Sequence, residues 1–285
     1  MKFRDIFLAV LVTLIWGSYF TASKIILISF PPLLFAGLRF LLLFIITSPF
    51  IFKDRPPIKT VFGFSIIMFL NMIALNHAIG LCMNLSPIIL INELVVPLST
   101  LFGIIVFKER FYMKDALGIA LAFIGFTLVI KIKTEESTSS IAIILAVIAS
   151  LLFAGYNLIA KKLASFNIIT VISLSSLFTF PMFLILSFFQ ENWPSLEEVQ
   201  PESVKALIYI VLIGSLLSHF LWMYLLNKYP LGKVVPFTLL SPLFGCIISV
   251  ITLGEKIKNN VLWGGALVML GLIIIELNKN YAQKK

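Results

Sequence analysis

Charged side chains are scarce in this sequence, and their scarcity excludes most soluble folds. Of its 285 residues, 12% are charged and 60% are apolar, whereas a soluble domain carries roughly 25% charged residues. The mean hydropathy is +1.08. So few charges cannot build a water-facing surface, and we therefore expect an all-α integral membrane protein.

Cysteines and catalytic motifs are also few. Cys82 and Cys246 are the only cysteines, and both lie in or beside apolar segments, which is typical of small core residues and not of a disulfide. No GxxxxGK[ST], HExxH, GxSxG or CxxC pattern occurs. We therefore expect no cofactor, no metal and no enzymatic activity, and no direct use of ATP.

Apolar runs divide nearly the whole chain into ten segments that are long enough to cross a bilayer. A crossing needs roughly 20 helical residues, and lipid cannot hydrogen-bond an exposed backbone, so each run is predicted to be a helix. The predicted spans are 5–23, 33–52, 60–79, 86–107, 115–131, 140–160, 168–188, 204–226, 234–253 and 261–277.

The distribution of Lys and Arg predicts the orientation. With the N-terminus inside, the inner segments hold 15 of the 22 basic residues and the outer segments hold 6, while Arg39 lies within a span. The positive-inside rule then places both termini in the cytoplasm. The formal charge of +9 therefore fits a membrane surface better than a nucleic acid.

The two halves of the chain repeat three patterns in the same order. Trp16-Gly17-Ser18-Tyr19 followed by Lys24 is echoed by Phe153-Ala154-Gly155-Tyr156 followed by Lys161. Pro97 precedes Glu109 much as Pro242 precedes Glu255, and two glycines follow each glutamate at equal offsets. The repeats would span 1–133 and 134–285. Because each holds five spans, the second must be inverted, which is typical of alternating-access carriers.

The Trp16-Gly17 helix, the segment 31–40, and the 97–109 and 242–255 stretches resemble the EamA-type family of the drug/metabolite transporter superfamily. The segment 31–40 is especially similar to that of bacterial exporters of O-acetylserine and cysteine. The resemblance covers the full length. It implies ten helices in two inverted bundles and export of amino acids or related metabolites.

Glu93 and Arg39 are the acidic and basic side chains predicted deepest in the membrane. A charge at that depth is costly unless it is paired, protonated or beside a wet cavity. At 1.5 Å per residue both lie roughly 10 Å below the outer interface, so they could pair. Asn71 and Trp16 fall near the same level. We expect Glu93 to bind a substrate ammonium or the coupled proton, while Arg39 balances its charge; a purely structural pair is the alternative.

Further polar and aromatic side chains are candidates for the same path. Ser215, His219 and Trp222 form a stripe on the eighth span, and His219 could take part in proton coupling or merely hydrogen-bond a neighbouring helix. Tyr19, Tyr156, Trp16 and Trp222 could face a cavity, because aromatic rings attract ammonium groups, or could be ordinary packing. These candidates are Glu93, Arg39, Asn71, Trp16, Tyr19, His219, Trp222 and Tyr156.

The leading interpretation is a secondary transporter that exports amino acids or similar metabolites across a bacterial inner membrane. Its partners would be a small-molecule substrate and membrane lipid, with a proton as one option for the coupling ion, and we expect no nucleic acid. A homodimer is one option for its assembly. A carrier for a nucleotide-type metabolite is the second interpretation, but Arg39 alone is too little buried positive charge for phosphates. An intramembrane enzyme is the third, and Glu93 with His219 is a thin basis for one.

Overall fold

The computed structural model of the chain describes residues 1–50, 56–95, 98, 102, 113–130, 139–163, 166–228, 237, 240–255 and 259–282. Regular structure in these residues is helical. The helices are α1 (Phe3–Ile26), α2 (Pro32–Thr47), η1 (Ser48–Phe50), α3 (Ile58–Leu81), α4 (Leu85–Asn92), α6 (Met113–Ile130), α7 (Ser140–Leu163), α8 (Ile168–Gln190), α9 (Pro201–Tyr209), η2 (Ile210–Leu217), α10 (Ser218–Lys228), α12 (Ser241–Leu253) and α13 (Asn259–Ala282).

The predicted all-helical architecture is confirmed. Because α9, the π-helical stretch η2 and α10 follow one another without a break, and η1 directly continues α2, the described residues form ten helical segments. Each segment overlaps one predicted span. Four of them are long and apolar enough to cross a membrane by length and composition alone, namely Phe3–Ile26, Ile58–Leu81, Ile168–Gln190 and Pro201–Trp222. The chain is thus a multi-pass membrane protein.

Several helix ends follow from local sequence chemistry. Pro32 is the first residue of α2, where its missing N–H costs no hydrogen bond. The Asn167 side chain caps α8 by accepting from the N–H groups of Ile169 and Thr170. Gly254 ends α12 with a φ of 67°, a left-handed conformation that favours glycine.

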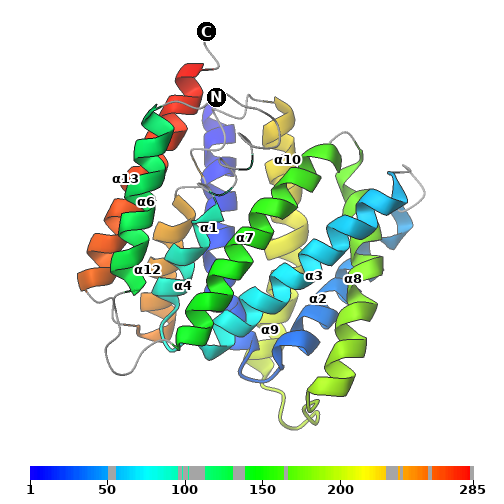
Figure 1. Cartoon of the computed structure of the whole chain (residues 1–285). Helices are drawn as coiled ribbons and strands as arrows, with labels where there is room; N and C mark the ends of the chain where they lie inside the picture. Colours follow the sequence, from blue (N-terminus) through cyan, green and yellow to red (C-terminus); the bar gives the residue numbers. More distant parts are fainter. Residues whose placement is uncertain are drawn as a thin grey trace.

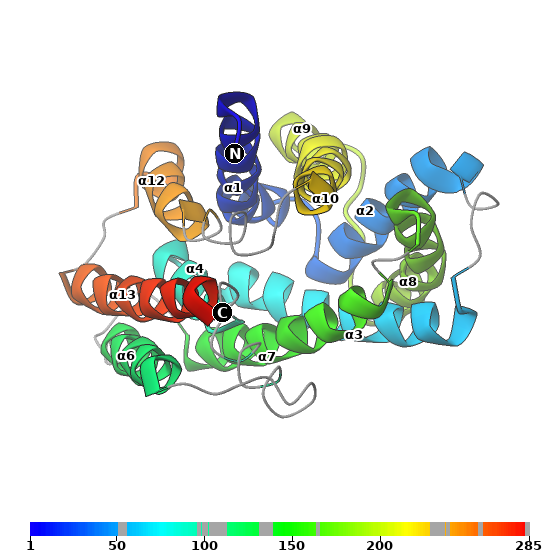
Figure 2. The same ribbon diagram turned by 90° about the horizontal axis from the view of Figure 1, so that it is seen from above.

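The helices are arranged as neighbouring groups that mix the first and second halves of the chain. α1 packs along α12 and along the α9–η2–α10 run, while α3 packs along α7. Figure 2 shows these groups on opposite sides of the molecule, with the α2 and α8 pair at one edge and the α6 and α13 pair at the other. α1 begins and α13 ends at the upper end of Figure 1, here called the terminal end; the opposite end is the far end.

Glycines permit the closest of these helix contacts. A Cβ atom on Gly17 of α1 would lie 2.7 Å from the carbonyl oxygen of Ser241 in α12, and one on Gly125 of α6 would lie 2.6 Å from the carbonyl oxygen of Gly264 in α13. The backbones therefore touch where small residues meet, as is common between membrane helices. Gly125 and Gly264, which belong to the repeated glycines, thus lie at a helix contact.

Candidate functional site

Arg39 is the centre of a buried polar cluster where four helical elements meet. Its side chain is 9% exposed. Its Nε donates to the Ser215 hydroxyl at 3.1 Å, and its Nη1 donates to the Tyr19 hydroxyl at 2.9 Å and lies 3.3 Å from the Met72 sulfur. The guanidinium also lies over the rings of Tyr19 and Phe40, 5.1 and 5.3 Å from their centroids. The cluster thus joins α1, α2 and α3 to η2.

The aromatic part of this cluster lies between α1 and α10. The Trp16 indole N–H donates to the Ser218 hydroxyl at 3.1 Å. Its ring lies 4.9 Å from the ring of Trp222 and 6.3 Å from that of His219, measured between centroids. His219 Nδ1 is 2.7 Å from the carbonyl oxygen of Ser215, and since a carbonyl only accepts, Nδ1 donates in this contact, while Nε2 makes no hydrogen bond to a described residue.

Local backbone geometry places Ser215 beside Arg39. Ser215 belongs to η2, whose π-helical turns are wider than those of the α-helices on either side. Gly214, with no side chain, precedes it, and the Ser218 hydroxyl donates to the carbonyl oxygen of Gly214 at 2.8 Å. π-Helical turns inside α-helices are frequent at functional sites, because they re-aim side chains.

Glu93 is buried where α4 loses its regular hydrogen bonding. Its side chain is 8% exposed. The N–H groups of Glu93 and Leu94 bond three residues back, to Leu90 and Ile91, and not four back as in an α-helix. Proline has no N–H, so Pro97 cannot supply the usual bond to the carbonyl oxygen of Glu93. Broken helices that expose carbonyl groups are the typical ion and substrate sites of carriers.

No ion pair joins Arg39 to Glu93 in the described part of the chain. Arg39 bonds to Ser215 and Tyr19 instead, and the Glu93 carboxylate makes no hydrogen bond to any described residue. The sequence thus indicated two deep charges and left open whether they pair, and in this conformation Arg39 bonds to other groups. Among the described residues, no opposite charge pairs with either side chain.

Two further candidates share no hydrogen bond or ring contact with the cluster among the described residues. Asn71 donates to the carbonyl oxygen of Ala149 at 2.8 Å, which ties α3 to α7. Tyr156 packs its ring 4.4 Å from that of Phe64 and 5.3 Å from that of Phe153. The cluster therefore brings together Arg39, Tyr19, Trp16, His219 and Trp222, while Asn71 and Tyr156 have helix-packing contacts.

Sequence analysis did not identify Met72 and Ser218 as members of the cluster. Ser218 had a signal that could have found it, because it lies between Ser215 and His219 on the polar stripe of the eighth span. Met72 follows Asn71 within an apolar run and carries no comparable signal. Pro97 and Glu109, the markers of the first repeat, lie outside the described residues.

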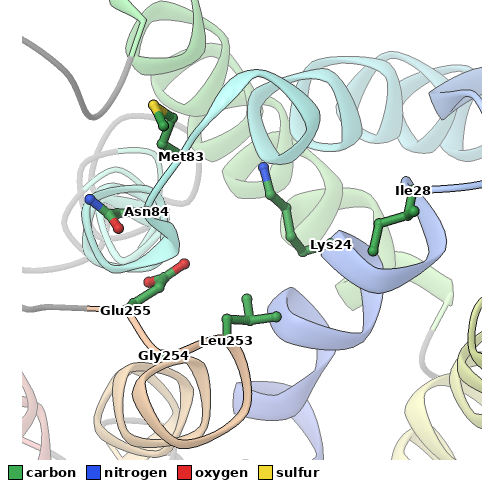
Figure 3. A pocket seen from close by; sticks show the side chains of 7 residues that line it. All are labelled: Lys24, Ile28, Met83, Asn84, Leu253, Gly254 and Glu255. Carbon is green, nitrogen blue, oxygen red and sulfur yellow. The ribbon is translucent and has the colours of Figure 1, made fainter.

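A second feature is a crevice at the far end, with a volume of about 670 Å³. Figure 3 shows its lining residues, Lys24, Ile28, Met83, Asn84, Leu253, Gly254 and Glu255.

Two charged residues of this crevice hold the turn between α3 and α4. The Lys24 ammonium donates to the carbonyl oxygens of Ile79, at 3.0 Å, and Cys82 at the end of α3. Glu255 accepts from the N–H of Leu85 at the start of α4, with both oxygens within 2.9 Å. A helix C-terminus favours a cation and an N-terminus an anion, so both charges hold the α3–α4 turn.

Two stretches of the chain, residues 4–131 and residues 140–277, match the EamA-like transporter family. A curated relative from Salmonella typhimurium, described as a probable amino-acid metabolite efflux pump, is 29% identical over 96% of this chain and 95% of its own length. A relative from Escherichia coli with the same description is 26% identical over the same shares. A solved crystal structure with 15% identity superposes with a TM-score of 0.70 over 99% of both chains, which supports the fold alone.

Proposed function

We propose that this chain, which belongs to the EamA-like transporter family, is a secondary carrier that exports amino acids or related small metabolites across the bacterial inner membrane. The observation that carries this proposal is the buried cluster around Arg39, where α1, α2 and α3 meet η2. Polar groups inside a membrane protein are costly and generally mark a substrate or ion path. The efflux pumps among the relatives favour this cargo and direction.

Alternating access between two inverted repeats, 1–133 and 134–285, is the proposed mechanism. The helix contacts support it because they are reciprocal. α1 packs along the α9–η2–α10 run as α3 packs along α7, and α1 contacts α12 as α7 contacts α4. If the first and sixth, third and eighth, and fourth and ninth segments are counterparts, each of these contacts has an equivalent contact under a pseudo-twofold rotation. The two separate matches to the family support the same division.

The proposed orientation has both termini in the cytoplasm. Its support is the excess of Lys and Arg in the segments assigned to that side. The start of α1 and the end of α13 also lie at one end of the molecule in Figure 1, as ten crossings require. The far-end crevice of Figure 3 would then open toward the periplasm.

Glu93 is the proposed site for a substrate ammonium or for the coupled proton. A carboxylate that is 8% exposed and has no partner among the described residues can exchange a proton or a cationic ligand without first breaking an ion pair. His219, with Nε2 left for another partner, could relay that proton. Proton coupling and a homodimeric assembly remain predictions.

A phosphorylated or nucleotide-type cargo is less well supported. Phosphate groups carry about two negative charges and generally need several cationic or N–H donors. Arg39 is the buried cation of this cluster, and its described neighbours are hydroxyl, thioether and aromatic groups. A cargo with a single carboxylate fits this charge better.

The proposal is tested by counterflow in proteoliposomes that contain the purified chain. Vesicles preloaded with one amino acid are diluted into trace labelled amino acid, with and without a pH gradient. We expect saturable counterflow for at least one amino acid or derivative, and protein-free vesicles are the control. If no amino acid is exchanged in either condition, an amino acid carrier is the wrong proposal.

A further inference from the structure

Arg39 is a buried cation without a protein counter-ion. Its side chain is 9% exposed, and no aspartate or glutamate in the described part of the chain pairs with it. The groups that contact it are the hydroxyls of Ser215 and Tyr19 and the sulfur of Met72, all of which are neutral. A buried charge is strongly disfavoured until an opposite charge balances it. The cluster is therefore electrostatically incomplete.

The guanidinium also has unused donors. A guanidinium has five N–H groups in one plane. Nε donates to Ser215, and the two protons of Nη1 point to Tyr19 and Met72. Nη2 makes no hydrogen bond to any described residue. Nη2 is also not among the polar side-chain atoms of the described residues that are fully buried without a partner.

The surroundings restrict what could bind there. The central carbon of the guanidinium lies 5.1 and 5.3 Å from the ring centroids of Tyr19 and Phe40, so these two neighbours are aromatic and uncharged. A carboxylate can accept a charge-assisted hydrogen bond from Nη2 and supplies the single negative charge that the guanidinium lacks, whereas a phosphate has excess charge.

We propose that Arg39 binds the carboxylate of the transported substrate through Nη2. The inference rests on the proposed function, and it narrows the cargo to molecules with a free carboxylate. Amides, esters and decarboxylated amines of the same molecules should be poor substrates. Arg39 then has a role distinct from balancing Glu93.

The first test needs no variant. The amino acid with the strongest counterflow is competed with its own amide, its methyl ester and its decarboxylated amine. Loss of a hydrogen-bonded charge pair should weaken competition by about tenfold or more. Equal competition by the acid and its amide overturns the inference, even though amino acid counterflow itself stands.

The second test uses variants and does not depend on transport. Thermal unfolding of the purified protein in detergent is followed with acetate, acetamide or chloride. We expect stabilisation by acetate in the wild type, less in Arg39→Lys and none in Arg39→Met, while acetamide and chloride have little effect. Lys205→Met removes an exposed cation outside the cluster and should keep the response. Stabilisation by chloride equal to that by acetate, or an acetate response that survives in Arg39→Met, contradicts a carboxylate site. If Arg39→Met does not fold, the analogue series and Arg39→Lys still decide.

Discussion

The ammonium nitrogen of Lys228 lies 2.8 Å from a carboxylate oxygen of Asp5, whose side chain is completely buried. The pair joins the start of α1 to the end of α10, and the Tyr224 hydroxyl lies 3.0 Å from Lys228 and 2.9 Å from Arg4. Together with the contacts that α9 and η2 make with α1, this pair holds α1 against the α9–η2–α10 run of the second half. The two helices are expected to move together.

Removing Lys228 should destabilise this junction. The Asp5 carboxylate would keep its 3.6 Å contact with Arg4 but would lose the 2.8 Å contact with the Lys228 ammonium. We expect a lower thermal midpoint for Lys228→Met than for the wild type in detergent. The exposed Lys205→Met is the matched control. A midpoint equal to that of Lys205→Met would mean that the pair contributes nothing to stability.

The same ion pair should be insensitive to pH across the neutral range. The hydrogen bond to Asp5 raises the pKa of Lys228 above its ordinary value. A raised lysine pKa stabilises the folded state at pH values below the unfolded pKa, and that contribution is lost only as the pH rises through the raised value. The difference in midpoint between wild type and Lys228→Met should therefore be the same at pH 6 and pH 8. A difference that disappears at pH 8 contradicts this assignment.

Glu93→Gln should remove the pH dependence of transport. Glutamine has nearly the same shape but cannot ionise, so it can neither carry a proton nor neutralise an ammonium group. We expect counterflow to fall by about tenfold or more, the usual cost of losing a charged hydrogen bond, and the remaining flux to be flat with pH. The exposed Glu197→Gln is the control. Undiminished transport with an unchanged pH profile removes Glu93 from the mechanism.

The helices could be predicted from the sequence, because lipid demands long apolar runs with internally bonded backbone. The deep position of Arg39 could be predicted for the same reason. Its partners could not, since Ser215 lies 176 residues away in the chain and a hydroxyl at that distance carries no contact signal. The expected partner, Glu93, was chosen for its charge and depth. Depth along a helix does not say which face a side chain occupies.

The role of Glu255 shows a similar limit. In the sequence, Glu255 stands out only as the glutamate that follows Pro242 in the second repeat. The structure makes it a cap for α4, a different helix, 170 residues away. The π-helical stretch η2 also had no clear sequence signal, because Gly214 and Ser215 are common within ordinary membrane helices. Both features depend on tertiary packing, which a pattern of apolar runs does not encode.

Gly17→Ala should weaken the packing of α1 on α12. The added Cβ would lie 2.7 Å from the Ser241 carbonyl oxygen and 2.8 Å from the Gly245 nitrogen, and both are backbone atoms that cannot turn aside. Overpacking of this kind typically costs about 1–3 kcal/mol. Gly155→Ala in α7 is the matched control, because its Cβ would meet nothing within 4 Å. We expect a lower midpoint only for Gly17→Ala. Equal midpoints for the two variants would mean that α1 and α12 are not in close contact.

Glu255→Gln should loosen the α3–α4 turn at the far end. The Glu255 carboxylate holds the N–H of Leu85, and on the other side of the turn Lys24 holds the carbonyl oxygen of Cys82. Cys82 is 2% exposed, so a thiol reagent can reach it only when the turn opens. In a Cys246→Ala background, where Cys82 is the remaining cysteine, we expect faster maleimide labelling in Glu255→Gln.

The exposed Glu202→Gln, measured in the same background, should label at the unmodified rate. In Glu255→Gln the new amide still accepts a hydrogen bond but has lost the negative charge that is favoured at a helix N-terminus. We therefore expect labelling of Cys82 in Glu255→Gln to be about twofold to fivefold faster, corresponding to roughly 0.3–1 kcal/mol. Lys24→Met should accelerate labelling as well, since it removes the cation from the end of α3. If Glu255→Gln and Lys24→Met both label at the rate of Glu202→Gln, these two charges do not hold the turn, and closure of the crevice must depend on apolar packing around Met83 and Leu253.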